Sequence, residues 1–517
     1  MGTNVLSIIT FAPLLGALII LFIPREKEDW IRWWSIAISL VPLGLAFFVY
    51  GQVRSAPGQM WFQEAYEWVP AISVYYRLGV DGISAVMLLL TALLSTLSYF
   101  YSAFTIKERV KEYYFLFLLL ETGMFGVFVS LDLILFYVFW EIGLVPMYLL
   151  IGVWGGERRI YAAIKFFLYT LVGSVALLLA ILGVYFQTGT FSILEAAAAH
   201  PFADNFSLAA LAFWGFFLGF AIKVPCFPFH TWLPDAHTEA PTAGSVILAG
   251  VLLKLGAYGF IRIVLPFFPQ VFRFYAYNLP LIPILAVISM VYGALVCMAQ
   301  WDLKRLIAYS SVSHMGYVML GISAAAASLA LERGHAALST SAVMALNGAT
   351  LQMFTHGIIT GGLFFLVGII YERAHTRDLR AFGGLASKVP YYYGITLVTG
   401  FASLGLPGLA GFWSEFFVFR GSFHIIPVFA AIGIVAVVLT AAYILWKVVQ
   451  QMFLGEFQQS KWDAATHHAP LSDMTWWEKV TMWPLVIVMV LVGVFPSVIV
   501  ALLNGATSAL LLAVSSC

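Results

Sequence analysis

The sequence predicts an all-α polytopic membrane protein with about fourteen transmembrane helices. Three observations support this fold class: 62% of the 517 residues are hydrophobic, only 10% are charged, and the mean hydropathy is +0.95. Soluble domains usually hold about 25% charged and about 45–50% apolar residues. A surface in water cannot hide such an excess, so a large soluble enzyme is excluded. The formal net charge of +1 leaves no basic surface for nucleic acid, and the expected partner of this surface is the lipid bilayer.

Fourteen apolar spans divide the chain, and most reach the roughly 20 residues that a membrane helix needs. They are apolar on nearly all sides rather than along one stripe, which favours helices inside a membrane. The strict alternation of β-barrel strands does not occur. The spans cover residues 3–23, 30–51, 79–104, 111–130, 131–152, 160–187, 207–233, 242–265, 279–300, 303–325, 338–371, 391–420, 425–453 and 477–504.

The placement of lysine and arginine predicts the orientation, because short loops on the inner side of a membrane are enriched in both. Most of them lie in the loops after odd-numbered spans or at the adjoining span ends: Arg25, Lys27, Arg32, Lys107, Arg109, Lys111, Arg158, Arg159, Lys304, Arg305, Arg373, Arg377, Arg380, Lys388, Lys461 and Lys479. The loops after even-numbered spans, counted with their adjoining span ends in the same way, hold Arg54, Arg77, Arg262, Arg273, Arg333 and Arg420. Both termini are therefore expected on the outer side of the membrane.

Several ionisable residues lie inside the spans, away from the span ends. One charge at the membrane centre costs about 2.5–3.5 kcal/mol, so several together indicate function. This argument favours a functional role over helix-locking ion pairs for Glu141, Lys223, Lys254 and Glu415, whereas it leaves both interpretations open for the others. The full set is Glu121, Glu141, Lys223, Lys254, His314, His356 and Glu415.

Counting along the spans orders these groups across the membrane. Glu141 and Lys254 lie at mid-membrane, Lys223 lies nearer the inner side and Glu415 nearer the outer side, with His314 between them. Titratable groups in such an order predict a path that passes protons across the membrane.

Prolines accompany three of the buried charges. Pro146 follows Glu141, Pro225 follows Lys223, and Pro407 precedes Glu415. The seventh and twelfth spans are the most interrupted, and paired broken helices in corresponding positions predict two inverted repeats around an ion site. The expected divisions are helices 1–3 in residues 1–110, a first five-helix repeat (spans 4–8) in 111–265, a second (spans 9–13) in 279–453, and a loop with helix 14 in 454–517.

The sequence was also considered for two kinds of metal site, a zinc site and an iron–sulfur cluster. His230, Asp235, His237 and Glu239 share one loop and could in principle bind zinc. The loop holds no cysteine, and its two acidic residues suit helix capping equally well, so no metal is expected. An all-cysteine iron–sulfur cluster needs about four thiolates, and the chain has only Cys226, Cys297 and Cys517.

Four stretches resemble the antiporter-like proton-pumping subunits of respiratory complex I. They are Phe139-Trp-Glu-Ile-Gly-Leu-Val-Pro-Met-Tyr148, Ala162-Ala-Ile-Lys-Phe-Phe-Leu-Tyr169, Lys223-Val-Pro225 and His230-Thr-Trp-Leu-Pro-Asp-Ala-His-Thr-Glu-Ala-Pro-Thr242. The resemblance extends from Gly79 through Leu454, most of the chain. Chains L and N of this family typically carry lysine where Gly411-Phe-Trp-Ser-Glu415 has glutamate, so the sequence is most similar to chain M.

The resemblance implies a fourteen-helix fold with two inverted repeats and a proton-translocating subunit of an NADH:quinone oxidoreductase. It implies Glu141 and Lys223 as the coupling pair, Lys254 as the central carrier, His314 as part of the polar axis and Glu415 as the exit-side carrier. No cofactor is implied on this chain, because FMN, the iron–sulfur clusters and quinone belong to partner subunits. Chains L and N are the implied partners, and Glu121 and His356 receive no role.

Two other functions share these motifs. One is a subunit of a multi-subunit cation/proton antiporter, and the other is the membrane arm of an energy-converting hydrogenase. A structural scaffold without proton traffic is the least favoured function, because a scaffold has no use for aligned buried charges.

Overall fold

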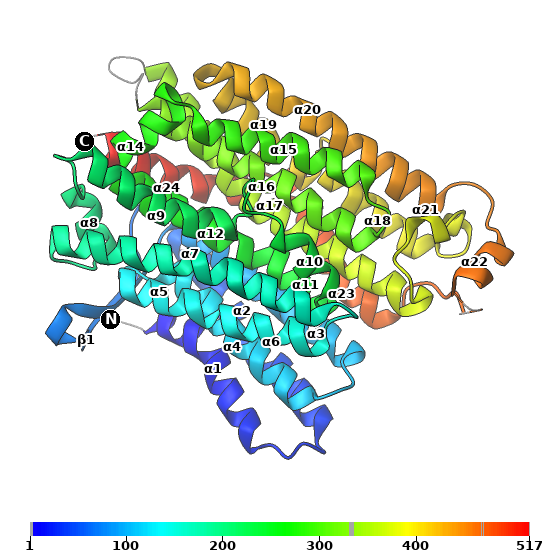
Figure 1. The fold of residues 1–517 in the computed structure, drawn as a ribbon. Helices are drawn as coiled ribbons and strands as arrows, with labels where there is room; N and C mark the ends of the chain where they lie inside the picture. The colour runs from blue at the N-terminus through cyan, green and yellow to red at the C-terminus, as the bar shows by residue number, and fades with distance from the viewer. Residues whose placement is uncertain (1–3, 330–335, 467, 469, 516–517) are drawn as a thin grey trace.

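The chain forms a bundle of long helices that run side by side (Figure 1). The structure, a computed structural model, describes residues 4–329, 336–466, 468 and 470–515, and it describes no side chains for 336–339. Arg333 and Cys517 lie outside the described residues. Within them, 13 helices are long and apolar enough to cross a membrane, which confirms a mostly helical polytopic membrane protein.

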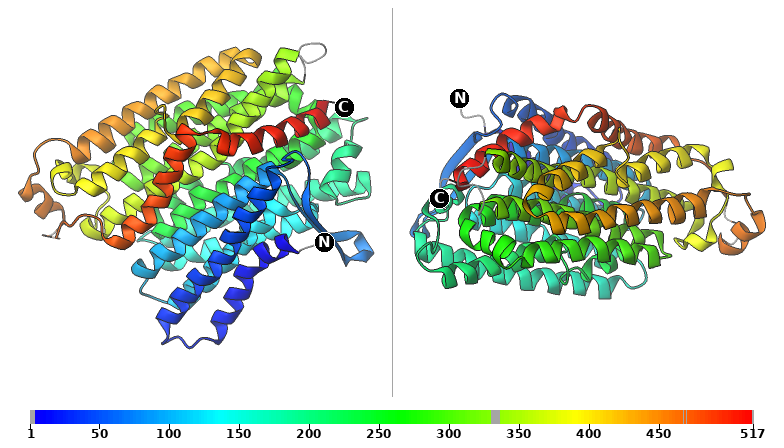
Figure 2. Two further views of the ribbon diagram at one scale, coloured as in Figure 1. Left: turned by 180° about the vertical axis from the view of Figure 1, so that it is seen from behind. Right: turned by 90° about the horizontal axis from the view of Figure 1, so that it is seen from above.

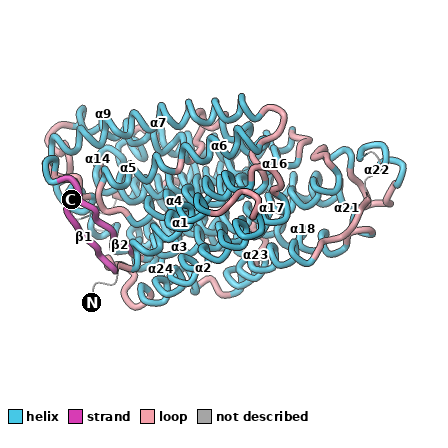
Figure 3. Tube along the Cα trace, turned by 90° about the horizontal axis from the view of Figure 1, so that it is seen from below, coloured by secondary structure: helices cyan, strands magenta, loops and turns pink. Residues whose placement is uncertain are grey.

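A β-hairpin that the sequence analysis did not predict lies at one end of the bundle (Figure 3). It occupies the stretch between the second and third spans, where the chain pairs its backbone groups across two antiparallel strands. Glu64 of the hairpin accepts hydrogen bonds from the backbone N–H groups of Leu6 and Ser7, so the hairpin caps the first helix. The elements of this part are α1 (Val5–Phe22), α2 (Glu28–Val53), β1 (Trp61–Val69), β2 (Val74–Val80) and α3 (Gly82–Thr105).

The middle of the chain contains several crossings built from more than one helix. One crossing stops at Lys223, and the next helix begins only at Trp232. Another, Thr242–Phe267, is continuous but includes two π-helical segments, Leu248–Leu252 and Phe260–Val264. The helices are α4 (Val110–Val129), α5 (Leu133–Ile142), α6 (Leu144–Trp154), α7 (Arg159–Thr188), α8 (Ile193–Ala199), α9 (Phe206–Lys223), α10 (Trp232–Glu239), α11 (Thr242–Ile247), α12 (Leu253–Gly259), α13 (Leu265–Phe267) and α14 (Pro269–Arg273).

The next part follows the expected spans with two differences. The expected tenth span is a helix, but its serines and His314 keep it out of the 13 candidate crossings. The expected twelfth span is divided, because one helix ends at Ser403 and the next begins at Ala410. The helices are α15 (Leu281–Ala299), α16 (Leu303–Ser328), α17 (Ala336–Ala374), α18 (Pro390–Ser403), α19 (Ala410–Ile425), α20 (Pro427–Tyr443) and α21 (Gln451–Phe453).

The prediction of one final helix over 477–504 is wrong. Two helices, α23 (Trp476–Val494) and α24 (Ser497–Ser515), follow the short helix α22 (Gln459–Thr466). Pro496 separates them, because proline cannot donate the backbone hydrogen bond that would continue a helix. Figure 2 shows the bend between them, and both helices pack against α17.

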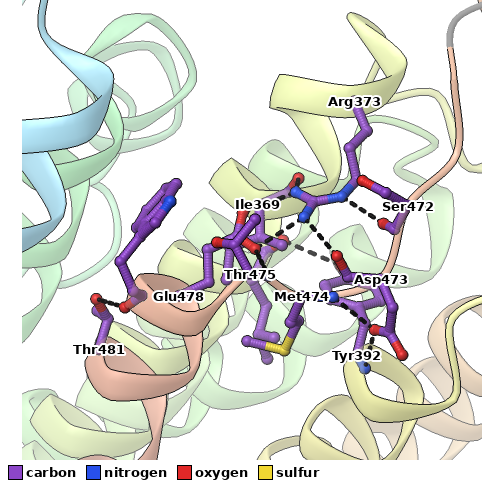
Figure 4. Close-up of polar contacts among 11 residues, drawn as sticks. Ile369, Arg373, Tyr392, Ser472, Asp473, Met474, Thr475, Glu478 and Thr481 are labelled. Atoms are coloured by element: carbon purple, nitrogen blue, oxygen red, sulfur yellow. Dashed lines mark hydrogen bonds and ion pairs between the residues drawn. The ribbon is translucent and has the colours of Figure 1, made fainter.

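Arg373, near the end of α17, joins three elements through all five of its N–H groups (Figure 4). Its two Nη atoms each donate to one carboxylate oxygen of Glu478, at 2.7 Å. The other N–H groups donate to the carbonyl oxygens of Ile369, Ser472 and Asp473. The Asp473 carboxylate accepts from the N–H of Tyr392 at 3.0 Å, so the same cluster holds the start of α18.

Candidate proton-transfer site

Four of the five site residues predicted from the sequence are buried in the helix bundle. The exposed fractions are 2% for Lys223, 0% for Lys254, 3% for His314 and 6% for Glu415. Glu141 is half-buried, at the end of α5. These groups come from separate helices, so tertiary packing decides which of them meet.

Lys254 meets a histidine that the sequence analysis left without a role. Its Nζ lies 2.7 Å from Nδ1 of His356, which α17 supplies, and it also donates to the carbonyl oxygen of Ala249. The π-helical segment Leu248–Leu252 directly precedes the helix that carries Lys254. Such segments occur frequently at functional sites. Lys254 therefore has a titratable neighbour in the second half of the chain.

His314 lies between His356 and Glu415. The two imidazole rings are 5.6 Å apart between centroids, and Nδ1 of His314 lies 3.6 Å from Oε1 of Glu415. Gln352 and Ser403 each place a polar atom 3.4 Å from a ring nitrogen of His314. Lys254, His356, His314 and Glu415 thus form a continuous series of buried titratable groups, which we call the central polar chain.

A small cavity accompanies the end of this chain. Its volume of about 10 Å³ is close to the space that one water molecule needs. The residues that line it include His314, Gln352, His356, Ser403 and Glu415. A water there could pass a proton between side chains that do not touch directly.

The gap between α18 and α19 makes room for Glu415. Gly405 in this gap has a φ of +76°, and a Cβ added to it would lie 2.7 Å from Oε2 of Glu415. Both the left-handed backbone and the close approach require glycine at this position.

Glu141 and Lys223 lie near each other without direct contact. No nitrogen–oxygen distance of 4.0 Å or less joins them, but Glu141 is the charged group that acts electrostatically on Lys223. The ammonium lies over the ring of Trp140, 5.0 Å from its centroid. Oε1 of Glu141 is buried and has no hydrogen-bond partner among the described residues. Helix α5 ends one residue after Glu141, and α6 begins at Leu144, two residues before Pro146.

Sequence reasoning missed several members of the site. His356 and Gln352 lie one helical turn apart on α17, a spacing that could have indicated one polar face. Ser414 also belongs to the site, because its Oγ donates to Oε1 of Gln352 at 2.5 Å. Ser403 and Ser414 gave no signal, since serine is common in membrane helices. Lys304 was counted as an inner loop charge, yet only 5% of it is exposed and its Nζ donates to the carbonyl oxygen of Ala240.

Arg262 was likewise counted in a loop. It lies on the continuous crossing Thr242–Phe267, is buried, and forms an ion pair with Asp81 at the start of α3. The charge count groups it with the outer loops because it lies near the end of the expected span over 242–265.

Three of the four residues tested as zinc ligands turn to separate partners. Asp235 pairs with Lys165 at 2.7 Å, and the Glu239 carboxylate accepts from the backbone N–H of Arg158 at 3.0 Å. Glu239 therefore binds the backbone of the residue before α7 and does not cap the helix that follows it. The ring of His237 stacks on Phe364, with 4.7 Å between centroids. Among the described residues, no group of three or more His, Cys, Asp or Glu side chains could hold a metal ion.

The fold and the buried charges define the chain as an antiporter-like membrane protein, and comparisons with known proteins agree. The family described as NADH:quinone oxidoreductase/Mrp antiporter, transmembrane, matches residues 130–440. NADH-quinone oxidoreductase subunit M of Rhodobacter capsulatus is 42% identical, over 97% of this chain and 95% of the relative. A chain of respiratory complex I from Thermus thermophilus has a TM-score of 0.83 and 31% identity, covering 98% of this chain and 99% of that one.

The same fold occurs in the Mrp complex from Dietzia, with a TM-score of 0.82 at 21% identity. The match covers 99% of this chain and 100% of that one. The chain belongs to the family of NADH-quinone oxidoreductase subunit M.

Proposed function

We propose that this chain is the proton-translocating membrane subunit of a bacterial complex I. The observation that carries the proposal is the central polar chain, because buried titratable groups in series have no use in an inert membrane anchor. Electron transfer takes place in partner subunits, which hold FMN, the iron–sulfur clusters and quinone. Chains L and N, the other antiporter-like subunits, are its neighbours in the membrane.

Each predicted site residue receives a role in this proposal. Glu141 and Lys223 form the coupling pair, and Lys254 is the central proton carrier. His356 and His314 connect Lys254 to Glu415, which exchanges protons with the outer side. The short distances along the central polar chain support this order.

One backbone feature, an isolated antiparallel bridge, occurs once in each half of the chain, and this supports the inverted repeats. Asp132 pairs with Ser192, and Asp302 pairs with Asp378, each through an isolated antiparallel bridge with two backbone hydrogen bonds of 2.8 and 2.9 Å. All four residues are helix N-caps. In each half, the bridge joins the start of the second helix to the residues that follow the third helix.

The two bridges lie at opposite ends of the bundle. The first adjoins α8 at one end, and the second adjoins residues 379–381, which contact α21 and α22 at the other end (Figure 1). Two halves related by inversion place the same feature on opposite membrane sides. We therefore assign residues 111–265 to the first repeat and 279–453 to the second, with α9–α10 and α18–α19 as the broken helices.

The orientation follows from the charges and the termini. The first and the last described residues lie at the end of the bundle that carries the β-hairpin (Figure 1). The loops expected to hold most of the lysines and arginines follow odd-numbered spans, which places the termini on the periplasmic side of the inner membrane.

The test of the proposed function is purification of the intact assembly through a tag on this chain. We expect co-purifying subunits that bind FMN and iron–sulfur clusters, and proton uptake into vesicles driven by NADH oxidation. Exchange of cations for protons by an assembly that oxidises no NADH would instead establish the antiporter function. Proton pumping driven by hydrogen evolution would establish the hydrogenase arm.

Replacing Glu415 by alanine is expected to slow proton pumping and to leave the assembly intact. The variant removes the last carboxyl of the central polar chain, while Gly405 leaves space that water can fill. Glu415→Lys is expected to keep part of the activity, because related chains carry lysine at this position. Dye quenching in reconstituted vesicles measures pumping, and native gels measure assembly. A normal pumping rate in assembled Glu415→Ala would exclude this exit route.

A further inference from the structure

Glu121 is a buried carboxyl that the central polar chain does not use. It lies in the middle of α4, is 0% exposed, and accepts a hydrogen bond from the Tyr99 hydroxyl at 2.8 Å. A buried carboxylate is ordinarily explained by an ion pair that locks two helices. Glu121 forms no ion pair with any described residue, and its Oε1 has no hydrogen-bond partner among them. A purely structural explanation is therefore weak.

The face of α3 that meets Glu121 carries a row of hydroxyl groups. Ser95, Ser98 and Ser102 follow one another at spacings of three and four residues, which places them on one side of the helix. Tyr99, which binds Glu121, lies within this segment and adjoins the same side. All four side chains are buried, at 0–1% exposure. Glu121 thus borders a polar seam between α3 and α4.

Two of these hydroxyls lack the partner that a buried hydroxyl normally has. The Oγ atoms of Ser95 and Ser98 are buried with no hydrogen-bond partner in the described part of the chain. Buried polar groups without protein partners are the ones that water satisfies. Together with Oε1 of Glu121, three unsatisfied polar atoms belong to the same seam. This second observation points to water or a proton as its occupant.

The seam extends toward one end of the bundle only. Ser102 lies 2.9 Å from the hydroxyl of Tyr113, one turn from the start of α4, which the proposed orientation places on the inner side. At a rise of about 1.5 Å per residue, successive serines are about 4.5–6 Å apart along the axis, a gap that one water can bridge. In the opposite direction along α3, this face carries Thr91, and the next hydroxyl beyond it is that of Ser84. The same rise separates Thr91 and Ser84 by about 10.5 Å along the axis, so the row of hydroxyls is interrupted there.

We infer that Glu121 is a further proton-carrying residue, which exchanges protons with the inner side through Ser95, Ser98, Ser102 and Tyr113. The inference rests on the proposed function, because it adds an uptake site to the same proton pump. In each cycle, the carboxylate of Glu121 binds one proton that arrives from water in the seam and passes that proton on into the pump, which restores the carboxylate. The bond to Tyr99 holds the carboxyl toward the seam in both states.

The decisive variant is Ser95→Ala combined with Ser98→Ala. Both hydroxyls lack a protein partner, so their removal is not expected to weaken the fold. We expect the intact assembly to keep its melting temperature and to pump protons about tenfold more slowly. A proton-transfer group typically contributes about 10²–10⁴-fold to a rate. The expected loss is smaller because water still fills part of the path. Thr122→Ala is the matched control, since that hydroxyl donates to the carbonyl of Leu118 on its own helix.

Glu121→Gln tests the carboxyl itself. Glutamine keeps an acceptor for Tyr99 but cannot release a proton, so we expect pumping to fall by at least the same factor. An infrared band of a carboxyl that changes its protonation during NADH oxidation is expected in the wild-type assembly and absent from this variant. If Glu121→Gln does not assemble, the pumping rate of the serine variant alone decides whether the inference holds.

The outcomes separate this inference from the proposed function. Normal pumping by both the serine variant and Glu121→Gln would overturn the inference, and the proposed function would stand if Glu141→Ala still stopped pumping. If neither the wild-type assembly nor any variant pumped protons during NADH oxidation, the proposed function itself would be overturned.

Discussion

Replacing Glu141 by alanine is expected to abolish most proton pumping and to suppress coupled electron transfer. Lys223 lies at the end of α9 in an apolar setting, with the ring of Trp140 beneath its ammonium. Burial disfavours the charged form of a lysine, and a carboxylate nearby opposes that effect. Glu141 is the carboxylate that acts on Lys223, so its removal leaves the ammonium without compensation.

The separation of Glu141 and Lys223 suits a switch of the protonation state of Lys223. They are further apart than a direct ion pair. For two unit charges about 6 Å apart at an effective dielectric constant near 20, the attraction would be about 2.8 kcal/mol. A displacement of a few ångströms would change this energy by an appreciable fraction. Gly143, which separates α5 from α6, lies two residues beyond Glu141, so a small shift at the end of α5 would move this carboxylate. A neighbouring subunit could use this movement to make Lys223 hold or release a proton.

Three companion variants sharpen the test. Glu141→Asp is expected to retain part of the activity, and Lys223→Met to be as damaging as Glu141→Ala. The double variant should be little worse than either single one, because the two residues act as a unit. Glu112→Ala is the control, since that carboxylate pairs with the exposed Arg25. Dye quenching measures pumping and native gels measure assembly; a fully assembled Glu141→Ala complex that pumps normally would remove the coupling pair from the mechanism.

Replacing Arg373 by alanine is expected to destabilise the chain by about 3–5 kcal/mol, the usual cost of removing one partner from a buried ion pair. The Glu478 side chain is only 1% exposed and would keep a charge without its partner. Three backbone carbonyls would also lose their donor. Because Asp473 in the same cluster caps α18, the loss should loosen the helix that leads to Ser403 and the central polar chain.

The measurement is the thermal unfolding midpoint of the purified assembly, together with its yield on native gels. Arg25→Ala is the matched control, because Arg25 pairs with Glu112 at 3.0 Å but its side chain is 75% exposed. Exposed pairs contribute about 0–1 kcal/mol. Equal midpoints for Arg373→Ala and Arg25→Ala would show that the cluster does not stabilise the end of α17.

Much of the fold was predictable because a membrane imposes local rules. A helix must be apolar over its length to cross the bilayer, so most of the fourteen expected spans correspond to helices. The errors arose where that rule is weak. The span over 477–504 is apolar on both sides of Pro496, so hydropathy could not detect the end of α23. The β-hairpin lies between spans, where hydropathy carries no information.

For the site, the sequence by itself determined which residues carry unusual chemistry. A charge in an apolar span is costly wherever its neighbours lie, so Glu141, Lys223, Lys254 and Glu415 could be singled out without coordinates. Only the tertiary structure decided which groups meet. Lys254 and His356 are about a hundred residues apart in sequence, as the bond between them records. Tyr99 reaches Glu121 from a neighbouring helix, and Lys304 is buried by elements that no span boundary reveals. Helix packing sets these contacts, and hydropathy and spacing describe one helix at a time.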